Sequence, residues 1–173
     1  VLLKRSRGGL LCTVDDAFDE WLQVEGNPDL EGIKLGFALL DEVLKPGITP
    51  GQVFVLLAKT GVGKSIFAMN IFHRMVTMQP DKKILFLSLE QTRGEWFERA
   101  RRIHKFYDPW ATEKDTIELY RNKLMIVDKN KVTPQEMENI LDQFAETAGR
   151  QPDFCVVDYL GYWARGFKGE SYE

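Results

Sequence analysis

The stretch that most constrains this chain of 173 residues runs from Gly51 to Ser65 and reads GQVFVLLAKTGVGKS. Its first part, Gln52 to Leu57, is apolar and predicts a strand. The second part has the spacing of a phosphate-binding loop, with alanine at the position of the usual first glycine. Glycines let successive backbone N–H groups turn toward phosphate oxygens, and the helix that follows adds the positive end of its dipole. The predicted nucleotide-binding residues are Ala58, Lys59, Thr60, Gly61, Val62, Gly63, Lys64, Ser65 and Ile66.

Two side chains of this loop carry the chemistry. Lys64 would bring a cation to the outer phosphates of ATP, which makes it a candidate catalytic residue, and Ser65 would offer its hydroxyl to Mg²⁺. The alternative is a glycine turn that binds nothing. The apolar strand before the loop, the helix after it and the GKS ending together favour the phosphate loop.

Two later apolar runs end in carboxylates. The run 83–90 reads KILFLSLE and ends at Glu90, and FCVVD ends at Asp158. Such runs are typical of parallel strands covered on both faces, and a polar residue at the carboxyl end faces the ligand crevice of an open sheet. We therefore expect Asp158 to hold Mg²⁺ opposite Ser65, and Glu90 to act as the catalytic group that activates water. At each position a carboxylate that only caps or turns the chain is the alternative.

The segments between these runs alternate in type. We expect a buried helix at 66–78, which is apolar around most of its circumference, a helix with one apolar side at 92–107 and a polar helix at 113–122. A capping box at Thr133 begins a helix at 133–148, and a further strand is expected at 124–127. This alternation indicates an α/β fold with a mostly parallel sheet and helices on both faces. One more short helix is expected at 39–44, ended by Pro46 and Gly47.

The helix at 92–107 has a basic side. A solvated face is the favoured interpretation, and a contact with nucleic acid or a neighbouring subunit is the alternative, for Arg99, Arg101, Arg102 and Lys105.

Residues 1–32 form a region of their own. A basic tail at 1–9 precedes a capping box formed by Thr13 and Asp16. The helix that this box begins has one apolar face, made of Val14, Ala17, Phe18, Trp21 and Leu22. From the pattern alone, this face could bury against its own domain or against a neighbouring subunit.

Composition sets broad limits. The net charge of −3 gives no support to nucleic-acid binding, although it allows a local basic patch. No apolar run of about 18 residues exists, so we expect no membrane contact. Cys12 and Cys155 lack metal or disulfide spacing. Cys155 is expected to be a core thiol, and both fit a cytoplasmic location. The chain begins with valine and not with methionine, so we expect it to be a processed chain or part of something longer.

Three blocks resemble the motor domain of DnaB-type hexameric replicative helicases: GFALLDEVLKPGITPGQVFVLLAKTGVGKSIFAMNI, ILFLSLEQT and VVDYLGYWARGFKGESYE. The similarity as a whole extends from about Ile33 to the end of the chain. The pairing of SLE with VDYL is more specific than the loop, because the related KaiC and RadA groups usually differ at both places. The resemblance implies a RecA-like P-loop NTPase at residues 33–173, with ATP and Mg²⁺ as cofactors. It also implies water activation by Glu90 and the loop and metal roles of Lys64, Ser65 and Asp158.

The resemblance further implies partners. They are single-stranded DNA, a homo-oligomer that is a hexameric ring in the full-length protein, and a primase and a loader. The helix ahead of the motor resembles a linker helix, which favours docking of residues 14–24 on the adjacent subunit.

Two departures from the family pattern matter. Lys59 and Thr60 stand where the family has arginine and proline. The chain also stops soon after Asp158, so we expect an incomplete domain. The strand between the loop strand and the Asp158 strand, the DNA-binding loops and an arginine finger would lie outside this chain. A direct ladder between those two strands would contradict a RecA-like strand order.

The sequence therefore predicts an ATP-hydrolysing DNA helicase motor of replication, which translocates on single-stranded DNA. One alternative is a RecA/KaiC/RadA-like ATPase that acts in recombination or regulation without unwinding. Another is a nucleotide-binding scaffold that does not hydrolyse. Polarity of translocation, DNA sequence preference and the identities of loader and primase are not determined by the sequence.

Overall fold

The computed structural model describes residues 13–24, 32–59 and 61–159. The chain forms two compact units, which we describe separately. The first comprises Val1–Lys34 and Ala38–Phe54, and the second comprises Leu35–Phe37 and Val55–Glu173. The basic tail, Cys12, Thr60 and the residues after 159 lie outside the described residues. The predicted boundary between residues 32 and 33 stays a prediction.

The first unit contains two helices, α1 (Val14–Val24) and α2 (Ala38–Val43). The predicted capping box of α1 is present, since Thr13 N donates to Asp16 Oδ2 at 2.8 Å and Asp16 N donates to Thr13 Oγ1 at 3.1 Å. A single antiparallel bridge joins Ile33 and Ile48. Beside it the backbone of residue 32 approaches that of residue 47 so closely that a Cβ on Gly32 would lie 2.5 Å from the Gly47 carbonyl carbon, which only glycine avoids.

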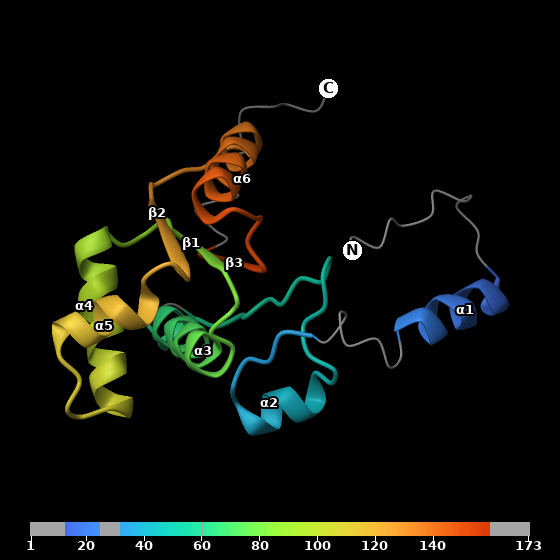
Figure 1. Cartoon of the computed structure of the whole chain (residues 1–173), viewed down its shortest axis with the longest axis horizontal. Coiled ribbons are helices and arrows are strands. Elements are labelled where there is room, and N and C mark those ends of the chain that lie inside the picture. Colours follow the sequence, from blue (N-terminus) through green and yellow to red (C-terminus); the bar gives the residue numbers. More distant parts are fainter. Residues whose placement is uncertain (1–12, 25–31, 60, 160–173) are drawn as a thin grey trace. The chain divides into compact units, whose positions relative to one another are not determined.

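The second unit is built on a sheet of three parallel strands in the order β2-β1-β3 (Figure 1). These are β1 (Ile84–Ser88), β2 (Leu124–Asp128) and β3 (Phe154–Asp158). Ser88 is the partner of Asp128 on one side and of Asp158 on the other. The carboxyl ends of the three strands therefore lie at one edge, where the sequence predicts the ligand crevice.

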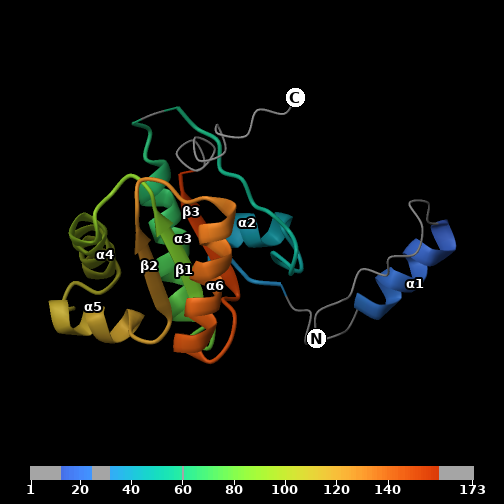
Figure 2. The same cartoon turned by 90° about the horizontal axis from the view of Figure 1, so that it is seen from above.

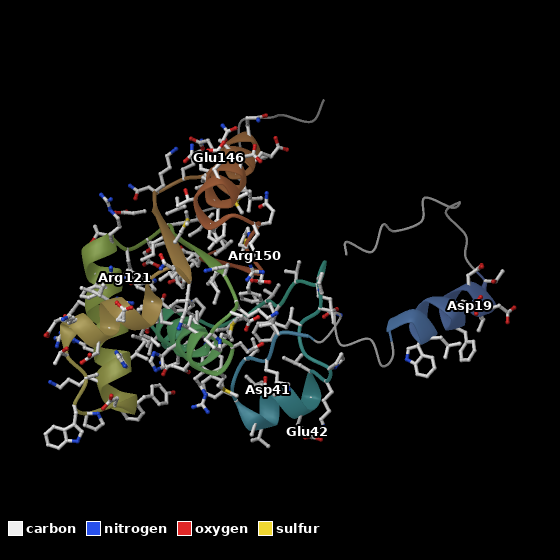
Figure 3. The ribbon with its side chains drawn as sticks, viewed as in Figure 1. Asp19, Asp41, Glu42, Arg121, Glu146 and Arg150 are labelled. Atoms are coloured by element: carbon white, nitrogen blue, oxygen red, sulfur yellow. The ribbon has the colours of Figure 1, made fainter. Side chains whose placement is uncertain are left out.

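Helices cover both faces of this sheet (Figure 2), as the sequence predicts. The covering helices are α3 (Lys64–Met78), α4 (Arg93–Tyr107), α5 (Glu113–Tyr120) and α6 (Pro134–Ala148). Leu85 and Leu87 on one face belong to a core cluster that includes Phe144 of α6. On the other face the Phe86 ring packs 6.2 Å from Phe72 of α3 and 5.6 Å from Trp96 of α4, between centroids. Side chains on the far sides of these helices, such as Glu146 of α6, point outward (Figure 3).

Each of α4, α5 and α6 begins with a capping box, in which a threonine and an acidic residue three positions later exchange hydrogen bonds with each other's backbone N–H. The pairs are Thr92 with Glu95, Thr112 with Asp115, and Thr133 with Glu136. The last of these, with Pro134 at the first helical position, is one that the sequence predicts. Within the described segments, no helix is both long enough and apolar enough to span a bilayer.

Two sequence predictions are wrong. Residues 52–57 form no strand, and most of their apolar side chains are exposed, including Val53 and Leu57 at 85% each. A strand needs a ladder partner, and in the described part of the chain β3 pairs with β1 alone. The direct ladder that would contradict a RecA-like order is therefore absent. Cys155 is exposed and is not a core thiol, because its strand β3 lies at the edge of the three-stranded sheet.

Candidate nucleotide-binding site

The loop before α3 ends in a helix N-terminus without a side-chain cap. Gly61 and Gly63 have φ angles of 82° and 99°, in the left-handed region where residues with a Cβ are strained. Gly63 is the N-cap residue of α3, and as a glycine it has no side chain that could cap the first N–H groups of the helix. The first N–H groups of α3 and the positive end of its dipole therefore face the loop, which suits an anion such as phosphate.

Lys64 is held by the loop itself. Its Nζ donates to the backbone oxygens of Ala58 at 3.1 Å and Lys59 at 3.0 Å. These contacts place the two predicted loop residues around the ammonium group rather than in the cavity wall. The cation is consequently at the loop before any phosphate is bound.

Ser65 and Asp158, which are 93 positions apart in the sequence, meet at the edge of the sheet. Ser65 Oγ donates to Asp158 Oδ1 at 3.1 Å. Asp158 is 6% exposed, and this burial raises the pKa of its carboxyl group. The Ser65 hydrogen bond lowers the same pKa, the charge of Glu90 raises it, and Arg99 and Lys64 lower it.

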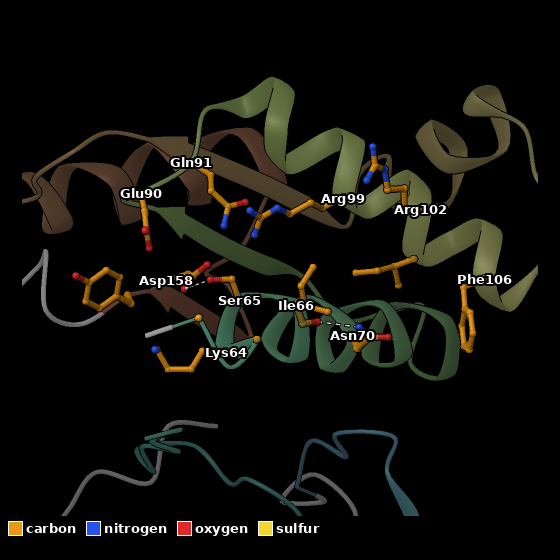
Figure 4. A pocket seen from close by; sticks show the side chains of 14 residues that line it. Lys64, Ser65, Ile66, Asn70, Glu90, Gln91, Arg99, Arg102, Phe106 and Asp158 are labelled. Atoms are coloured by element: carbon orange, nitrogen blue, oxygen red, sulfur yellow. Dashed lines mark hydrogen bonds between the residues drawn. The ribbon is translucent and has the colours of Figure 1, made fainter. Parts of the chain in front are cut away.

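Glu90 lies on the bend that follows β1, two residues after Ser88. Its side chain is exposed and enters the same cavity as Asp158 (Figure 4). The two carboxylates therefore come from neighbouring parallel strands but differ in environment, one buried against a hydroxyl and one open to solvent. This difference suits two different roles, one for a metal ion and one for water.

A cavity of about 750 Å³ joins these groups. The sequence-predicted residues that line it are Gly61, Gly63, Lys64, Ser65, Ile66, Glu90 and Asp158. Ala58, Lys59 and Val62 do not line it, and Thr60 lies outside the described residues.

Sequence reasoning missed the other wall of the cavity. Its lining also includes Asn70 of α3, Gln91, Tyr159, and Arg99, Arg102, Ile103 and Phe106 of α4. The four α4 residues recur at spacings of three and four, which is the signal of a single helical stripe. The sequence spacing indicates that these four residues lie on one side of α4. Whether that side faces the cavity depends on how α4 packs against α3.

The predicted solvated arginine face holds for part of α4. Arg101 and Arg102 both pair with Glu98, with nitrogen–oxygen distances of 2.9 and 2.8 Å. Arg102 also lines the cavity but is paired with Glu98, whereas Arg99 lines the cavity and its charge acts on Asp158. This arginine belongs to the site rather than to the solvated face.

The residues present fit a magnesium nucleotide. A hydroxyl and a carboxylate 3.1 Å apart are oxygen groups of the kind that Mg²⁺ prefers, and uncapped N–H groups with a lysine and an arginine beside them suit phosphates.

Comparison with known families decides the class. Residues 32–171 match the family described as the DnaB-like helicase C terminal domain. The chain belongs to this family. Its fold class, a RecA-like P-loop NTPase domain of the α/β type, is the one that the sequence predicts.

Two relatives illustrate the match. The chain is 27% identical over 154 residues to the replicative DNA helicase DnaB of Pasteurella multocida, covering 80% of this chain and 32% of that protein. It is 40% identical over 123 residues to the DNA repair protein RadA of Mycobacterium tuberculosis, covering 71% of this chain and 21% of that protein. The chain thus spans about a third or less of the length of these curated relatives.

Two solved structures share the fold. The ATPase domain of a phage helicase aligns with a TM-score of 0.63 at 20% identity, over 92% of this chain and 61% of that one. The second structure is that of a DnaB-like replicative helicase, reported together with its interactions with primase. It aligns with a TM-score of 0.65 at 19% identity, over 88% of this chain and 40% of that one.

Proposed function

We propose that this chain is part of the motor of a replicative DNA helicase, which hydrolyses ATP with Mg²⁺ to translocate on single-stranded DNA. The observation that carries the proposal is the contact between Ser65 Oγ and Asp158 Oδ1 at 3.1 Å, in a cavity that also contains Lys64 and Glu90. Membership of the DnaB-like helicase C-terminal family supports it.

Each residue has a role in this proposal. Ser65 and Asp158 would hold Mg²⁺, which when bound neutralises charge on the phosphate oxygens. Lys64 leaves the carbonyls of Ala58 and Lys59 and binds the outer phosphates. Residues 58–63 and Ile66 supply the backbone around them.

Glu90 completes the chemistry. Its exposed carboxylate orients a water molecule and accepts its proton as the water oxygen bonds to the terminal phosphorus and the bond to the leaving phosphate oxygen breaks. Arg99, which lies in the same cavity, is a cation available to the terminal phosphate.

The experiment is ATP turnover by the intact protein with and without single-stranded DNA. We expect DNA-stimulated release of phosphate, and we expect Lys64→Ala to weaken ATP binding because it removes a direct phosphate contact. Unchanged affinity in Lys64→Ala would show that the triphosphate does not lie where we place it. Absence of turnover in the unaltered protein would contradict the proposal and favour the nucleotide-binding scaffold.

The proposed partners are single-stranded DNA, other copies of the chain in a hexameric ring, and a primase and a loader, in the cytoplasm. Similarity to a replicative DNA helicase, and to a DnaB-like helicase whose structure concerns its interactions with primase, supports the DNA and primase parts. For ring assembly, the supporting feature is the exposed apolar face of α1, where the Phe18 and Trp21 rings stack with centroids 5.7 Å apart. Burying each such side chain against an adjacent subunit would stabilise the ring by roughly 1.5–3 kcal/mol.

The α1 face gives a direct test of assembly. The double variant Phe18→Asp with Trp21→Asp should dissociate the oligomer and leave each subunit folded, as measured by light scattering and circular dichroism. Asp19→Asn, on the same helix, is the matched control and should leave the ring intact. An intact ring in the double variant would remove α1 from the interface.

A second candidate function has support from the RadA match at 40% identity. In that case the chain would belong to a RecA-like ATPase that acts in repair or recombination without unwinding. Strand displacement on a forked DNA substrate separates the two, because a helicase releases the labelled strand in an ATP-dependent manner. ATP turnover without strand release would favour the second candidate.

A further inference from the structure

The wall of the cavity contains a buried amide whose oxygen lacks a partner. Gln91 is 8% exposed and lines the cavity next to Glu90. Among the residues that the structure describes, no hydrogen-bond donor reaches Gln91 Oε1, which is itself fully buried. An unpaired buried carbonyl oxygen lowers stability, so its presence in the wall of this cavity needs a reason.

The backbone of Gln91 is firmly placed. Ser88 Oγ donates to the Gln91 carbonyl oxygen at 2.7 Å, and the next residue, Thr92, begins the capping box of α4. Ser88 is also the ladder partner of Asp158. The backbone of Gln91 is therefore fixed relative to the residues that would hold the metal ion.

Arg99 of α4, which lines the same cavity, has no partner among the residues that the structure describes. Three arginines of this helix pair with carboxylates: Arg93 with Asp128, Arg101 with Glu98 and Glu113, and Arg102 with Glu98. Within the described ranges, Arg99 makes no ion pair or hydrogen bond, although its charge acts on Asp158 and Glu95. Figure 4 draws the amide of Gln91 and the guanidinium of Arg99 directed toward one another above Ser65 and Asp158.

We propose that Gln91 is a positioning residue of the nucleotide site, whose carboxamide oxygen orients the Arg99 guanidinium toward the terminal phosphate. This inference rests on the proposed function. A guanidinium has five N–H groups in one plane, so it binds a phosphate with two and still donates to a carbonyl oxygen. A neutral acceptor fixes that plane without cancelling the charge, whereas a carboxylate at this position would compete with the phosphate.

The competing use of Gln91 is structural. The indole Nε1–H of Trp96 is also buried without a partner in the described part of the chain, so it is the alternative donor for Gln91 Oε1. A purely structural pair would stabilise the fold and would be indifferent to the third phosphate. The two uses therefore differ in what they predict for nucleotide binding.

The test compares Mg²⁺-ADP with a non-hydrolysable ATP analogue in the intact protein. Gln91→Leu should weaken binding of the analogue roughly five- to tenfold and leave ADP binding unchanged, because the lost hydrogen bond acts on the phosphate only through the orientation of Arg99. Arg99→Ala should lose the same preference for the analogue. The double variant should be no weaker than Arg99→Ala, because the two residues act as one unit.

Stability measurements and one control complete the design. Gln91→Leu should keep or raise the thermal midpoint, since it removes an unpaired buried oxygen. Trp96→Phe should keep the preference for the analogue. If Gln91→Leu lowers the midpoint but keeps that preference, or if its effect adds to that of Arg99→Ala, the proposal is overturned. If the unaltered protein binds neither nucleotide, the proposed function itself fails, which is a distinct result.

Discussion

Strand β1 and residues 52–57 have similar sequences and different structures. Both are apolar runs that contain leucine and phenylalanine, and both lead to a predicted site residue. Every residue of β1 is buried, and the strand has a parallel partner on each side. Residues 52–57 have no ladder partner among the described residues, and most of their side chains are exposed. The difference teaches that an apolar run becomes a strand only where neighbouring strands accept its backbone hydrogen bonds.

The largest expected effect is on stability. Leu87 of β1 is fully buried, so Leu87→Ala should lower the free energy of unfolding by about 2–5 kcal/mol through lost burial and a residual cavity. The matched variant Leu57→Ala, at a position 85% exposed, should change it by less than about 0.5 kcal/mol. Urea denaturation of both variants measures the contrast. Equal losses would show that residues 52–57 are packed in solution.

The next effect is on ATP hydrolysis and compares Glu90, which follows β1, with Lys64, which lies in the loop after residues 52–57. Glu90→Gln removes the charge that orients water and leaves the phosphate loop intact, so it should raise the barrier to hydrolysis by roughly 2–4 kcal/mol. Binding of ATP with Mg²⁺ should persist, in contrast to Lys64→Ala. Steady-state turnover and equilibrium binding of both variants separate the roles. Near-normal turnover in Glu90→Gln would remove Glu90 from catalysis.

A third effect comes from the core between α3, α4 and α5, behind one face of β1. His73 is 2% exposed, and its Nδ1 lies 2.9 Å from the Tyr120 hydroxyl, in a hydrogen bond. Burial lowers the pKa of His73 to about 4, and the charges of His104 and Arg74 act in the same direction. Above its ordinary pKa, His73 is neutral in both folded and unfolded chains. Between that value and 4 only the unfolded chain takes up the proton, so stability falls as the pH falls.

The loss from His73 should reach about 2–3 kcal/mol on going from pH 7 to pH 4. His73→Gln keeps a hydrogen-bonding group for Tyr120 and cannot titrate, so its unfolding free energy should depend less on pH over this range. Urea midpoints at pH 7, 5.5 and 4.5 for both proteins give the comparison. Identical pH slopes would mean that His73 is already charged or exposed in the folded protein.

The smallest effect concerns Asp158, the proposed metal ligand at the end of β3. Burial raises the pKa of Asp158, and Mg²⁺ binding requires the ionised carboxylate. Binding of Mg²⁺-nucleotide should therefore weaken on acidification at a higher pH than for an ordinary aspartate. Asp158→Asn should bind Mg²⁺-nucleotide more weakly and should lose this pH dependence. Titration of binding affinity between pH 7 and pH 4 tests both expectations.

The parts of the fold that could be predicted are those encoded locally. The runs ending near Glu90 and at Asp158 are self-evident strands because their apolar residues are continuous and their ends are polar. The capping boxes mark helix starts to within a residue. Parallel strands then bring the two carboxylates to one edge without further information.

The parts that could not be predicted depend on packing between distant segments. Arg99 belongs to the site because α4 turns that stripe toward α3, which the helical period alone does not specify. The exposure of Cys155 follows from the edge position of β3, and the open form of residues 52–57 follows from the missing ladder partner. Each of these depends on which element lies next to which.

The uncapped start of α3 has a consequence for amide hydrogen exchange. Phe67 N is the first amide of this helix to donate within it, to Gly63 O at 2.9 Å. The amides of residues 64–66 have no partner among the residues that the structure describes, and we expect them to depend on water or a ligand. Without nucleotide they should exchange quickly, unlike the amide of Glu95, which donates to Thr92 Oγ1. A bound phosphate would slow exchange at those three positions, so the order of this helical turn would report the nucleotide state.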